Sequence, residues 1–131
     1  MEMLIDFPGD DRVDAHFDAM TVSTDQPHRD GSVAFAPTPY DTFLASLGTC
    51  AGIYVLGFCR QRNLPTDGIR LIERIQFNPT THLADVLDLE IQVPAEFPAK
   101  YYDALIRSAD QCMVKQQIER PPVFHINTRV V

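Results

Sequence analysis

Positive charge is scarce in this sequence. Its 131 residues contain 11 Lys and Arg against 18 Asp and Glu, which gives a net charge of −7. Such a chain repels phosphate groups instead of releasing counterions from them, so we expect no nucleic-acid partner. Residues 1–6 contain acidic but no basic side chains, whereas a secretory leader starts with a basic region. We therefore expect a cytoplasmic protein.

Motifs for metals and cofactors are also missing. The three cysteines are an odd number without a CxxC pair, which argues against a disulfide framework and against a closed zinc site. The four histidines show neither HxxxH nor HxH spacing, and there is no Gly-rich phosphate loop or GxSxG elbow. We expect no metal and no cofactor, so the cysteines are either core residues or reactive thiols.

The hydrophobic fraction of 45% is too high for disorder. The length suits one core, so we expect a single domain over residues 1–131. Apolar residues that alternate predict strands, and apolar residues at helical spacing predict helices. In chain order we expect two strands over residues 3–22 joined at 8–11, a polar loop over 23–37 with a short strand at 32–35, a helix over 39–63, strands over 69–77 and 87–93, a helix over 98–119 and a final strand over 123–131.

The helix over residues 39–63 has clear start and stop signals. Thr38 and Asp41 have the spacing of a capping box, and Pro39 suits the first helical turn. Asn63 tolerates the left-handed conformation at a helix end, and the following Pro65 prevents continuation. We therefore expect these residues to fix both ends of the helix.

The same helix is unusually apolar. Residues 42–59 carry no charge, and eighteen residues reach the length at which a membrane span is a candidate. The segment contains Thr, Ser and three glycines, so we expect no membrane span. A helix that is apolar on every side is buried on every side, which a short chain with two helices does not easily achieve. We expect an oligomer. A helix that crosses at Gly48 and Gly52, within the chain or across a dimer axis, would offset the roughly 1 kcal/mol cost of each helical glycine.

The cysteines of this helix point in different directions. Cys50 and Cys59 are nine residues apart, which places them about 180° apart in azimuth and roughly 13 Å apart along the axis. Cys112 falls on the apolar face of the helix over residues 98–119. If the two helices cross near Cys50, the thiols of Cys50 and Cys112 converge as a nucleophile and a resolving thiol would. Buried cysteines also serve as small hydrophobic residues, which is the interpretation we favour for Cys59 and leave open for the other two.

A reactive Cys50 needs help to lower its pKa. It lies about twelve residues beyond the start of its helix, and the helix dipole acts only within the first turn. A cation from another segment is therefore required. The candidates on loops or helix ends are Arg12, Arg29, Arg60 and Arg62.

Two segments resemble a known family. Residues 36–50, Ala-Pro-Thr-Pro-Tyr-Asp-Thr-Phe-Leu-Ala-Ser-Leu-Gly-Thr-Cys, resemble the helix that carries the first cysteine in the OsmC/Ohr family, and residues 109–114, Ala-Asp-Gln-Cys-Met-Val, resemble its second-cysteine segment. The order of elements is similar along nearly the whole chain. The resemblance implies an α+β fold in which antiparallel hairpins wrap around long central helices in an intertwined homodimer, with active sites between the subunits.

The resemblance also implies an activity, the reduction of organic hydroperoxides by a thiol peroxidase in an oxidative stress response. Cys50 would attack the peroxide bond, Cys112 would resolve the sulfenic acid as a disulfide, and a dithiol such as a lipoyl group would regenerate the pair. The activating cation would be Arg12 or Arg29, oriented by Asp41. The substrate pocket would include the residues near Cys50 on its helix, namely Tyr40, Phe43, Leu47 and Tyr54.

Three positions depart from the peroxidase branches of that family. Those branches place Glu ten residues before the first cysteine, where this chain has Tyr40, and often place Pro after the second, where it has Met113. Their Gly-Gly-Arg segment is matched only loosely by residues 9–12. These departures motivate an alternative function, a non-catalytic dimeric protein that binds a small hydrophobic ligand at the subunit interface.

Overall fold

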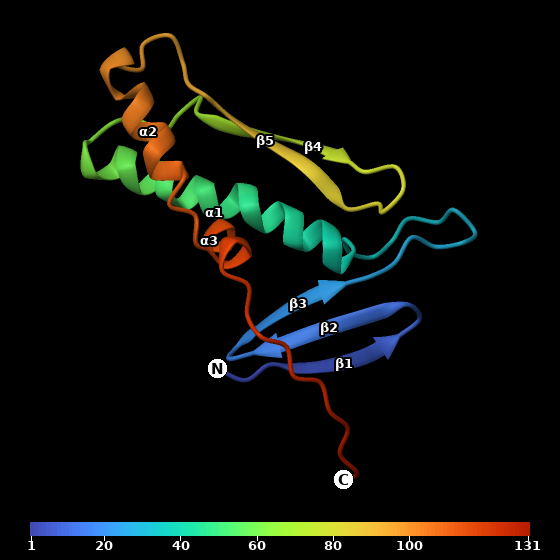
Figure 1. Ribbon diagram of the computed structural model, residues 1–131. Helices are drawn as coiled ribbons and strands as arrows, with labels where there is room; N and C mark the ends of the chain where they lie inside the picture. Colours follow the sequence, from blue (N-terminus) through green and yellow to red (C-terminus); the bar gives the residue numbers. More distant parts are fainter. The chain divides into compact units, whose positions relative to one another are not determined.

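The computed structural model describes residues 1–131, which form two compact units. The N-terminal unit is Met1–Ser46 and the C-terminal unit is Leu47–Val131. The long helix α1 (Pro39–Gln61) begins in the first unit and continues in the second (Figure 1). The chain combines helices with small antiparallel sheets, as expected of an α+β protein. The single domain expected over residues 1–131 stays a prediction.

The N-terminal unit contains a three-stranded antiparallel sheet in the order β1 (Leu4–Gly9), β2 (Arg12–Phe17) and β3 (Met20–Thr24). The prediction of two strands over residues 3–22 was therefore wrong. A second turn follows β2, where Asp18 has a φ of 50°, and Asp is one of the few residues that adopt this left-handed conformation readily.

The loop after β3 contains no strand at residues 32–35, contrary to the prediction. Asp25, which is 1% exposed, holds this loop together through hydrogen bonds to its backbone. The Asp25 carboxylate accepts the backbone N–H groups of Gln26 at 2.8 Å and Phe35 at 2.7 Å. These bonds, led by the one from Phe35, lower the pKa of Asp25. Because a side chain binds the Phe35 amide, the segment folds back as a loop.

The predicted ends of α1 are largely confirmed. The N–H of Asp41 donates to Thr38 Oγ1 at 3.1 Å, and the Thr38 N–H donates to the Asp41 carboxylate at 3.3 Å, which completes the capping box. The helix ends at Gln61, two residues earlier than predicted, and Asn63 has a left-handed φ of 53°.

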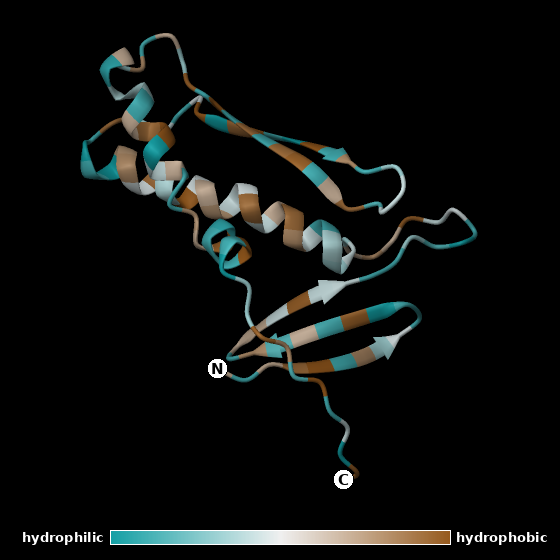
Figure 2. Ribbon diagram, viewed as in Figure 1, coloured by the Kyte–Doolittle hydropathy of each residue, from teal (hydrophilic) through white to brown (hydrophobic).

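Hydrophobic residues occur along the length of α1 (Figure 2), but their burial differs between its faces. Ala51, Val55, Phe58 and Cys59 are buried, whereas Ile53 on another face is 67% exposed. By length and composition α1 is the one helix that could cross a membrane, a criterion that the core helix of a soluble protein also meets. The described chain alone therefore does not cover this helix on every side.

The helical glycines differ in their surroundings. A Cβ at Gly48 would lie 2.5 Å from Oε2 of Glu73, whereas a Cβ at Gly52 or Gly57 would meet nothing within 4 Å. The close contact expected at a glycine is thus present at Gly48, and its partner is a strand side chain and not a second helix.

The C-terminal unit contains an antiparallel hairpin of β4 (Arg70–Phe77) and β5 (Ala84–Gln92), which confirms the predicted pair of strands. Side chains of the two strands pack against a core that α1 shares with the following helix. The buried members of this core are Ala51, Val55, Phe58, Cys59, Phe97, Leu105, Ala109 and Cys112.

The predicted helix over residues 98–119 is broken. It consists of a 3₁₀ turn η1 (Ala99–Tyr101), α2 (Tyr102–Ala109) and α3 (Met113–Glu119). Cys112 interrupts it with extended backbone angles, φ −47° and ψ 121°, and its sulfur caps α3. The apolar residues keep helical spacing through the break, which is why their pattern predicted one helix.

Residues 123–131 form no strand, so this prediction was also wrong. A strand requires a hydrogen-bonded partner, and the described chain pairs none with this segment. Ile126 and Val130 are each 95% exposed.

Candidate active site

Two thiols meet inside the C-terminal unit. Cys50, on α1, is partly exposed, whereas Cys112, between α2 and α3, is 3% exposed. Both are free, and their sulfurs lie within hydrogen-bond reach of each other. The two helical segments therefore do cross at Cys50, which was the condition for the thiols to converge.

Cys112 is held by the backbone around it. Its Sγ accepts the N–H of Lys115 at 3.4 Å and lies 3.8 Å from the carbonyl oxygen of Leu47 on α1. Burial raises the pKa of Cys112, and the hydrogen bond from its thiol to Cys50 raises it further. Cys112 is thus the protonated partner of the pair at neutral pH.

At Cys50, hydrogen bonds outweigh burial in their effect on the pKa. Burial would raise its pKa, but hydrogen bonds from the Val114 N–H, the Cys112 thiol and the Met113 N–H outweigh it and lower the pKa of Cys50 below its ordinary value. Two of these donors belong to the first turn of α3. Because a thiolate is the nucleophilic form of cysteine, the arrangement presents one activated sulfur and one thiol that can react with it afterwards.

The sequence did not indicate these donors. We expected a cation to activate Cys50 because Cys50 lies too far from the start of its own helix for that dipole to act on it. The expected continuous helix over residues 98–119 offered no free N–H groups in its middle. Cysteine is not among the usual N-cap residues, so nothing in the sequence marked Cys112 as the start of α3.

The expected cation Arg12 lies in the N-terminal unit and has partners there. Its Nη2 donates to Oδ2 of Asp14 at 3.0 Å, and its guanidinium lies 4.1 Å from the ring centre of Phe35. Asp14 is 5% exposed. Arg12 is therefore paired with Asp14. Asp41, which we expected to orient the cation, accepts the Thr38 hydroxyl at 2.7 Å in its capping box, and its role toward the cation stays a prediction.

The other candidate cations have different surroundings. Arg29 is exposed on the loop of the N-terminal unit, and Arg60 is exposed at the end of α1. Arg62 stacks over the ring of Phe58 at 3.8 Å and donates to its carbonyl oxygen at 3.3 Å. Arg62 is thus a packing partner of the core, whose charge lies near Cys59.

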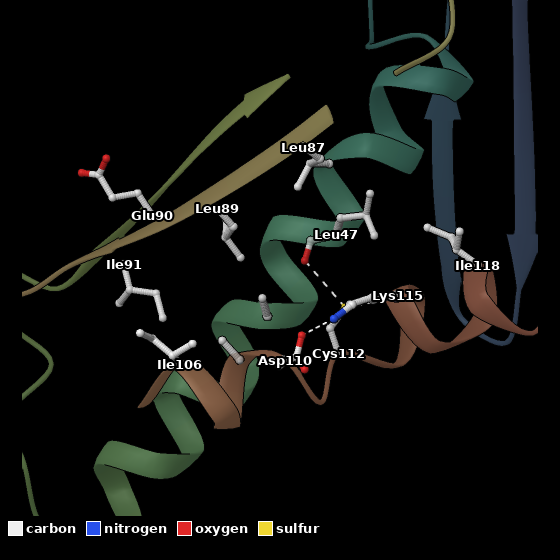
Figure 3. Close-up of a pocket in the computed structure, with 12 residues that line it drawn as sticks. Leu47, Leu87, Leu89, Glu90, Ile91, Ile106, Asp110, Cys112, Lys115 and Ile118 are labelled. Atoms are coloured by element: carbon white, nitrogen blue, oxygen red, sulfur yellow. Dashed lines mark hydrogen bonds and ion pairs between the residues drawn. The ribbon is translucent and has the colours of Figure 1, made fainter. Parts of the chain in front are cut away.

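A cavity of about 670 Å³ lies next to the thiol pair, within the C-terminal unit. Figure 3 shows Cys112 and Lys115 in its wall, with aliphatic side chains of α1, β5 and α2 around them. These aliphatic side chains include Leu47, Leu87, Leu89, Ile91 and Ile106. Such a lining suits an apolar ligand next to a reactive sulfur.

The predicted pocket residues are not all at this cavity. Leu47 lines it, and Tyr54 lines a second cavity in the same unit. Tyr40 and Phe43 lie in the N-terminal unit, where their rings stack with centroids 6.1 Å apart. The structure thus brings Leu47, Cys50 and Cys112 together.

Lys115 is a charged residue at the cavity that sequence reasoning missed. Its Nζ forms an ion pair with Asp110 and lies 3.9 Å from a carboxylate oxygen of Glu119. The hydrogen bond with Asp110 raises the pKa of Lys115. A lysine in a short polar helix looks like any solvated surface charge, so its place beside a thiol left no signal in the sequence.

Glu73 was also missed. It lies on the apolar face of β4, between Leu71 and Ile75 and opposite Leu89 of β5. Burial raises its pKa, the backbone N–H of Gly48 partly opposes this, and its Oε1 is buried without a partner. A signal did exist, because the alternation of apolar residues in this strand places a carboxylate in a position that faces the core.

No group of three or more His, Cys, Asp or Glu side chains is arranged to hold a metal ion. The expectation of a protein without metal or cofactor stays a prediction.

Comparisons with known proteins identify the family. A family model described as OsmC-like protein matches residues 29–127. A solved structure named for osmotic stress induction and detoxification response, from Psychrobacter arcticus, is 19% identical, with 88% of this chain and 85% of that chain covered and a TM-score of 0.71. An OsmC-like protein of unknown function from Vibrio cholerae is 10% identical, with coverages of 90% and 92% and a TM-score of 0.59. No match was found among curated proteins. Because the family model covers most of the chain, this protein belongs to the OsmC-like family.

Proposed function

We propose that this protein is a thiol peroxidase that reduces organic hydroperoxides, with Cys50 as the nucleophile and Cys112 as the resolving thiol. The observation that carries the proposal is the unequal thiol pair. Hydrogen bonds lower the pKa of Cys50, whereas burial raises the pKa of Cys112. The two sulfurs therefore have different reactivity although they share one hydrogen bond.

The reaction has one oxidation and one condensation. The Cys50 thiolate attacks the terminal peroxide oxygen, an S–O bond forms as the O–O bond breaks, Cys50 becomes a sulfenic acid, and the leaving alkoxide takes a proton to become an alcohol. Cys112 then attacks the Cys50 sulfenic acid, an S–S bond forms, and the departing hydroxide leaves as water with the Cys112 proton. A dithiol, such as a lipoyl group, reduces the disulfide by thiol exchange.

The proposed assembly is a cytoplasmic homodimer that acts in a stress response. Support for a second copy comes from apolar side chains of the C-terminal unit that the single chain leaves open. These are Ile53, Ile106, Met113 and Ile118, which are 67%, 60%, 69% and 49% exposed. Sedimentation of the protein as a monomer at micromolar concentration would contradict this part of the proposal.

Peroxide consumption tests the activity. With cumene hydroperoxide and dihydrolipoamide, the wild type should turn over repeatedly, and Cys50→Ser should lower the rate on the order of 10³-fold because the nucleophile is lost. Cys59→Ala is the matched control, and we expect its rate within about twofold of wild type because Cys59 is packed in the core. Repeated turnover by the Cys50→Ser variant would contradict the proposal.

The activating cation is tested separately. Arg12→Met should slow peroxide consumption about a hundredfold if this guanidinium stabilises the attacking thiolate, and Arg29→Met should have a small effect because Arg29 is an exposed loop residue. The reverse order would assign the cation to Arg29.

The alternative function, non-catalytic binding of a small hydrophobic ligand, is favoured by one observation. Asp41, the acidic residue next to the position where the peroxidase branches have Glu, is bound to Thr38. A protein that binds an apolar fluorescent probe in its cavity but leaves hydroperoxide untouched would support this alternative.

A further inference from the structure

Lys115 and Cys112 share one wall of the cavity beside the thiol pair. They are joined through the backbone, because the Lys115 N–H donates to Cys112 Sγ at 3.4 Å. The Lys115 ammonium is near enough to Cys112 for a charge on the sulfur to act on it. Figure 3 shows the Lys115 nitrogen beside Cys112, directed toward Asp110.

Two carboxylates hold this ammonium in place. Asp110 precedes Cys112 by two residues and forms the ion pair, and Glu119 lies 3.9 Å away on α3. The side chains of Lys115 and Asp110 are 44% and 64% exposed, and ion pairs this exposed contribute little to stability. The pairs therefore fix the position of the ammonium more than they stabilise the fold.

Cys112 needs a positive charge at one step of the proposed reaction. It must become a thiolate to attack the oxidised Cys50, and its burial at 3% exposure opposes that charge. Among the residues that line the cavity, Lys115 is the only lysine or arginine. The remaining charged residues there are Asp110 and Glu90, and Glu90 is paired with Arg74 at 2.8 Å.

We propose that Lys115 stabilises the Cys112 thiolate and so accelerates disulfide formation with Cys50. This inference rests on the proposed function. In the step concerned, the Cys112 sulfur bonds to the Cys50 sulfur, the S–O bond of the sulfenic acid breaks, and hydroxide leaves as water with the proton from Cys112. No reagent is needed beyond the hydroperoxide that formed the sulfenic acid. When a dithiol later attacks the Cys50 sulfur, Cys112 leaves as the same thiolate.

The chain offers a matched control, because Lys100 and Lys115 are its only lysines. Lys100 lies on η1 with its Nζ 5.0 Å from the ring centre of Tyr101. Lys115→Met and Lys100→Met remove the same charge from the same unit. Lys115→Arg keeps the charge and serves as the rescue variant.

The first experiment follows one turnover. Each variant receives one equivalent of cumene hydroperoxide, and mass spectrometry measures sulfenic acid, trapped by dimedone, and disulfide over time. Lys115→Met should form sulfenic acid at the wild-type rate but form the disulfide about threefold more slowly. Without the ammonium, a smaller fraction of Cys112 is thiolate, and the greater nucleophilicity of a thiolate with a higher pKa offsets this loss only in part. Lys100→Met should match wild type. An unchanged rate of disulfide formation in Lys115→Met would overturn the inference.

The second experiment needs no peroxide. In a Cys50→Ser background, the rate of Cys112 alkylation by iodoacetamide is measured against pH by peptide mass spectrometry. The rate should rise with pH as Cys112 ionises. Lys115→Met should move the midpoint of this rise to higher pH, Lys115→Arg should restore the wild-type midpoint, and Lys100→Met should leave it unchanged. A midpoint that stays fixed would mean that any slower disulfide formation is structural, and the inference fails. A midpoint that moves in a protein without peroxidase activity would refute the proposed function and keep the role of Lys115 toward the thiolate.

Discussion

Helix α1 contains the triplet Gly-x-Cys twice, at residues 48–50 and at 57–59. At the first triplet, Gly48 contacts the Glu73 carboxylate and Cys50 receives hydrogen bonds from the first turn of α3. At the second, the space beside Gly57 is open and Cys59 is fully buried. One local sequence thus occurs in a polar setting and in an apolar one, on the same helix.

The difference shows what activates a thiol here. Burial raises the pKa of Cys59, although the Arg62 charge partly opposes it. Burial also opposes ionisation of Cys50, but directed hydrogen bonds overcome it. Hydrogen-bond donors that point at the sulfur therefore lower the pKa of a thiol more effectively than a cation at longer range. The second triplet serves as the comparison for the first.

The largest expected effect is on thiol reactivity. At pH 7, iodoacetamide should alkylate Cys50 about a hundredfold faster than Cys59, because Cys50 is partly exposed and has a lowered pKa whereas Cys59 is fully buried in the core and has a raised pKa. Peptide mass spectrometry of the native protein measures both rates. Comparable rates would show that the two triplets do not differ chemically. Unfolding in urea should remove the difference, which is the control.

A smaller effect is expected on stability. Gly57→Ala meets open space and should raise the free energy of unfolding by up to about 1 kcal/mol through helix propensity. Gly48→Ala places a Cβ 2.5 Å from Oε2 of Glu73, the end of a side chain that must then shift, so it should stabilise the protein less than Gly57→Ala. Urea denaturation measures both variants, and equal gains would refute the assigned contact.

The smallest effect concerns the pH dependence of Glu73. Because burial raises its pKa in the fold, its contribution to stability is complete below the unfolded pKa near 4.5 and is lost as the pH rises through the folded pKa. Glu73→Gln keeps the group neutral, so its gain over wild type should be about 1 kcal/mol larger at pH 8 than at pH 4.

Glu90 on the same hairpin is the control of opposite sign. Gln92 and Arg74 lower its pKa, so its contribution is present above the unfolded pKa and is lost as the pH falls. Glu90→Gln should therefore lose a little stability at pH 8, and less than Glu73→Gln gains there, because the pair of Glu90 and Arg74 is exposed. A gain at pH 8 in both variants would contradict this account.

Local signals in the sequence were sufficient for parts of the fold. Thr38, Asp41 and Asn63 act through short-range hydrogen bonds and backbone preferences, so the ends of α1 were predictable within two residues. Strand alternation likewise predicted the hairpin of β4 and β5. The break at Cys112 was not predictable, because it depends on a sulfur that replaces a conventional cap and leaves the apolar spacing unchanged.

The candidate site was predictable to a similar extent. Helical spacing placed Cys50 and Cys59 on opposite faces and Cys112 on an apolar face, which is enough to expect that one pair meets. The donors of Met113 and Val114 are backbone groups, which exist in any sequence and become available only where a helix starts. Their place beside Cys50 follows from tertiary packing that no local pattern encodes.

The start of α3 links the redox state of the thiols to backbone hydrogen bonds. The Met113 and Val114 amides bind the Cys50 sulfur, and the Lys115 amide binds the Cys112 sulfur. A disulfide removes the negative charge of Cys50 that the Met113 and Val114 amides bind, so the first turn of α3 loses these partners when the pair is oxidised. Hydrogen exchange at these two amides should then become faster on oxidation, as one helical turn loosens.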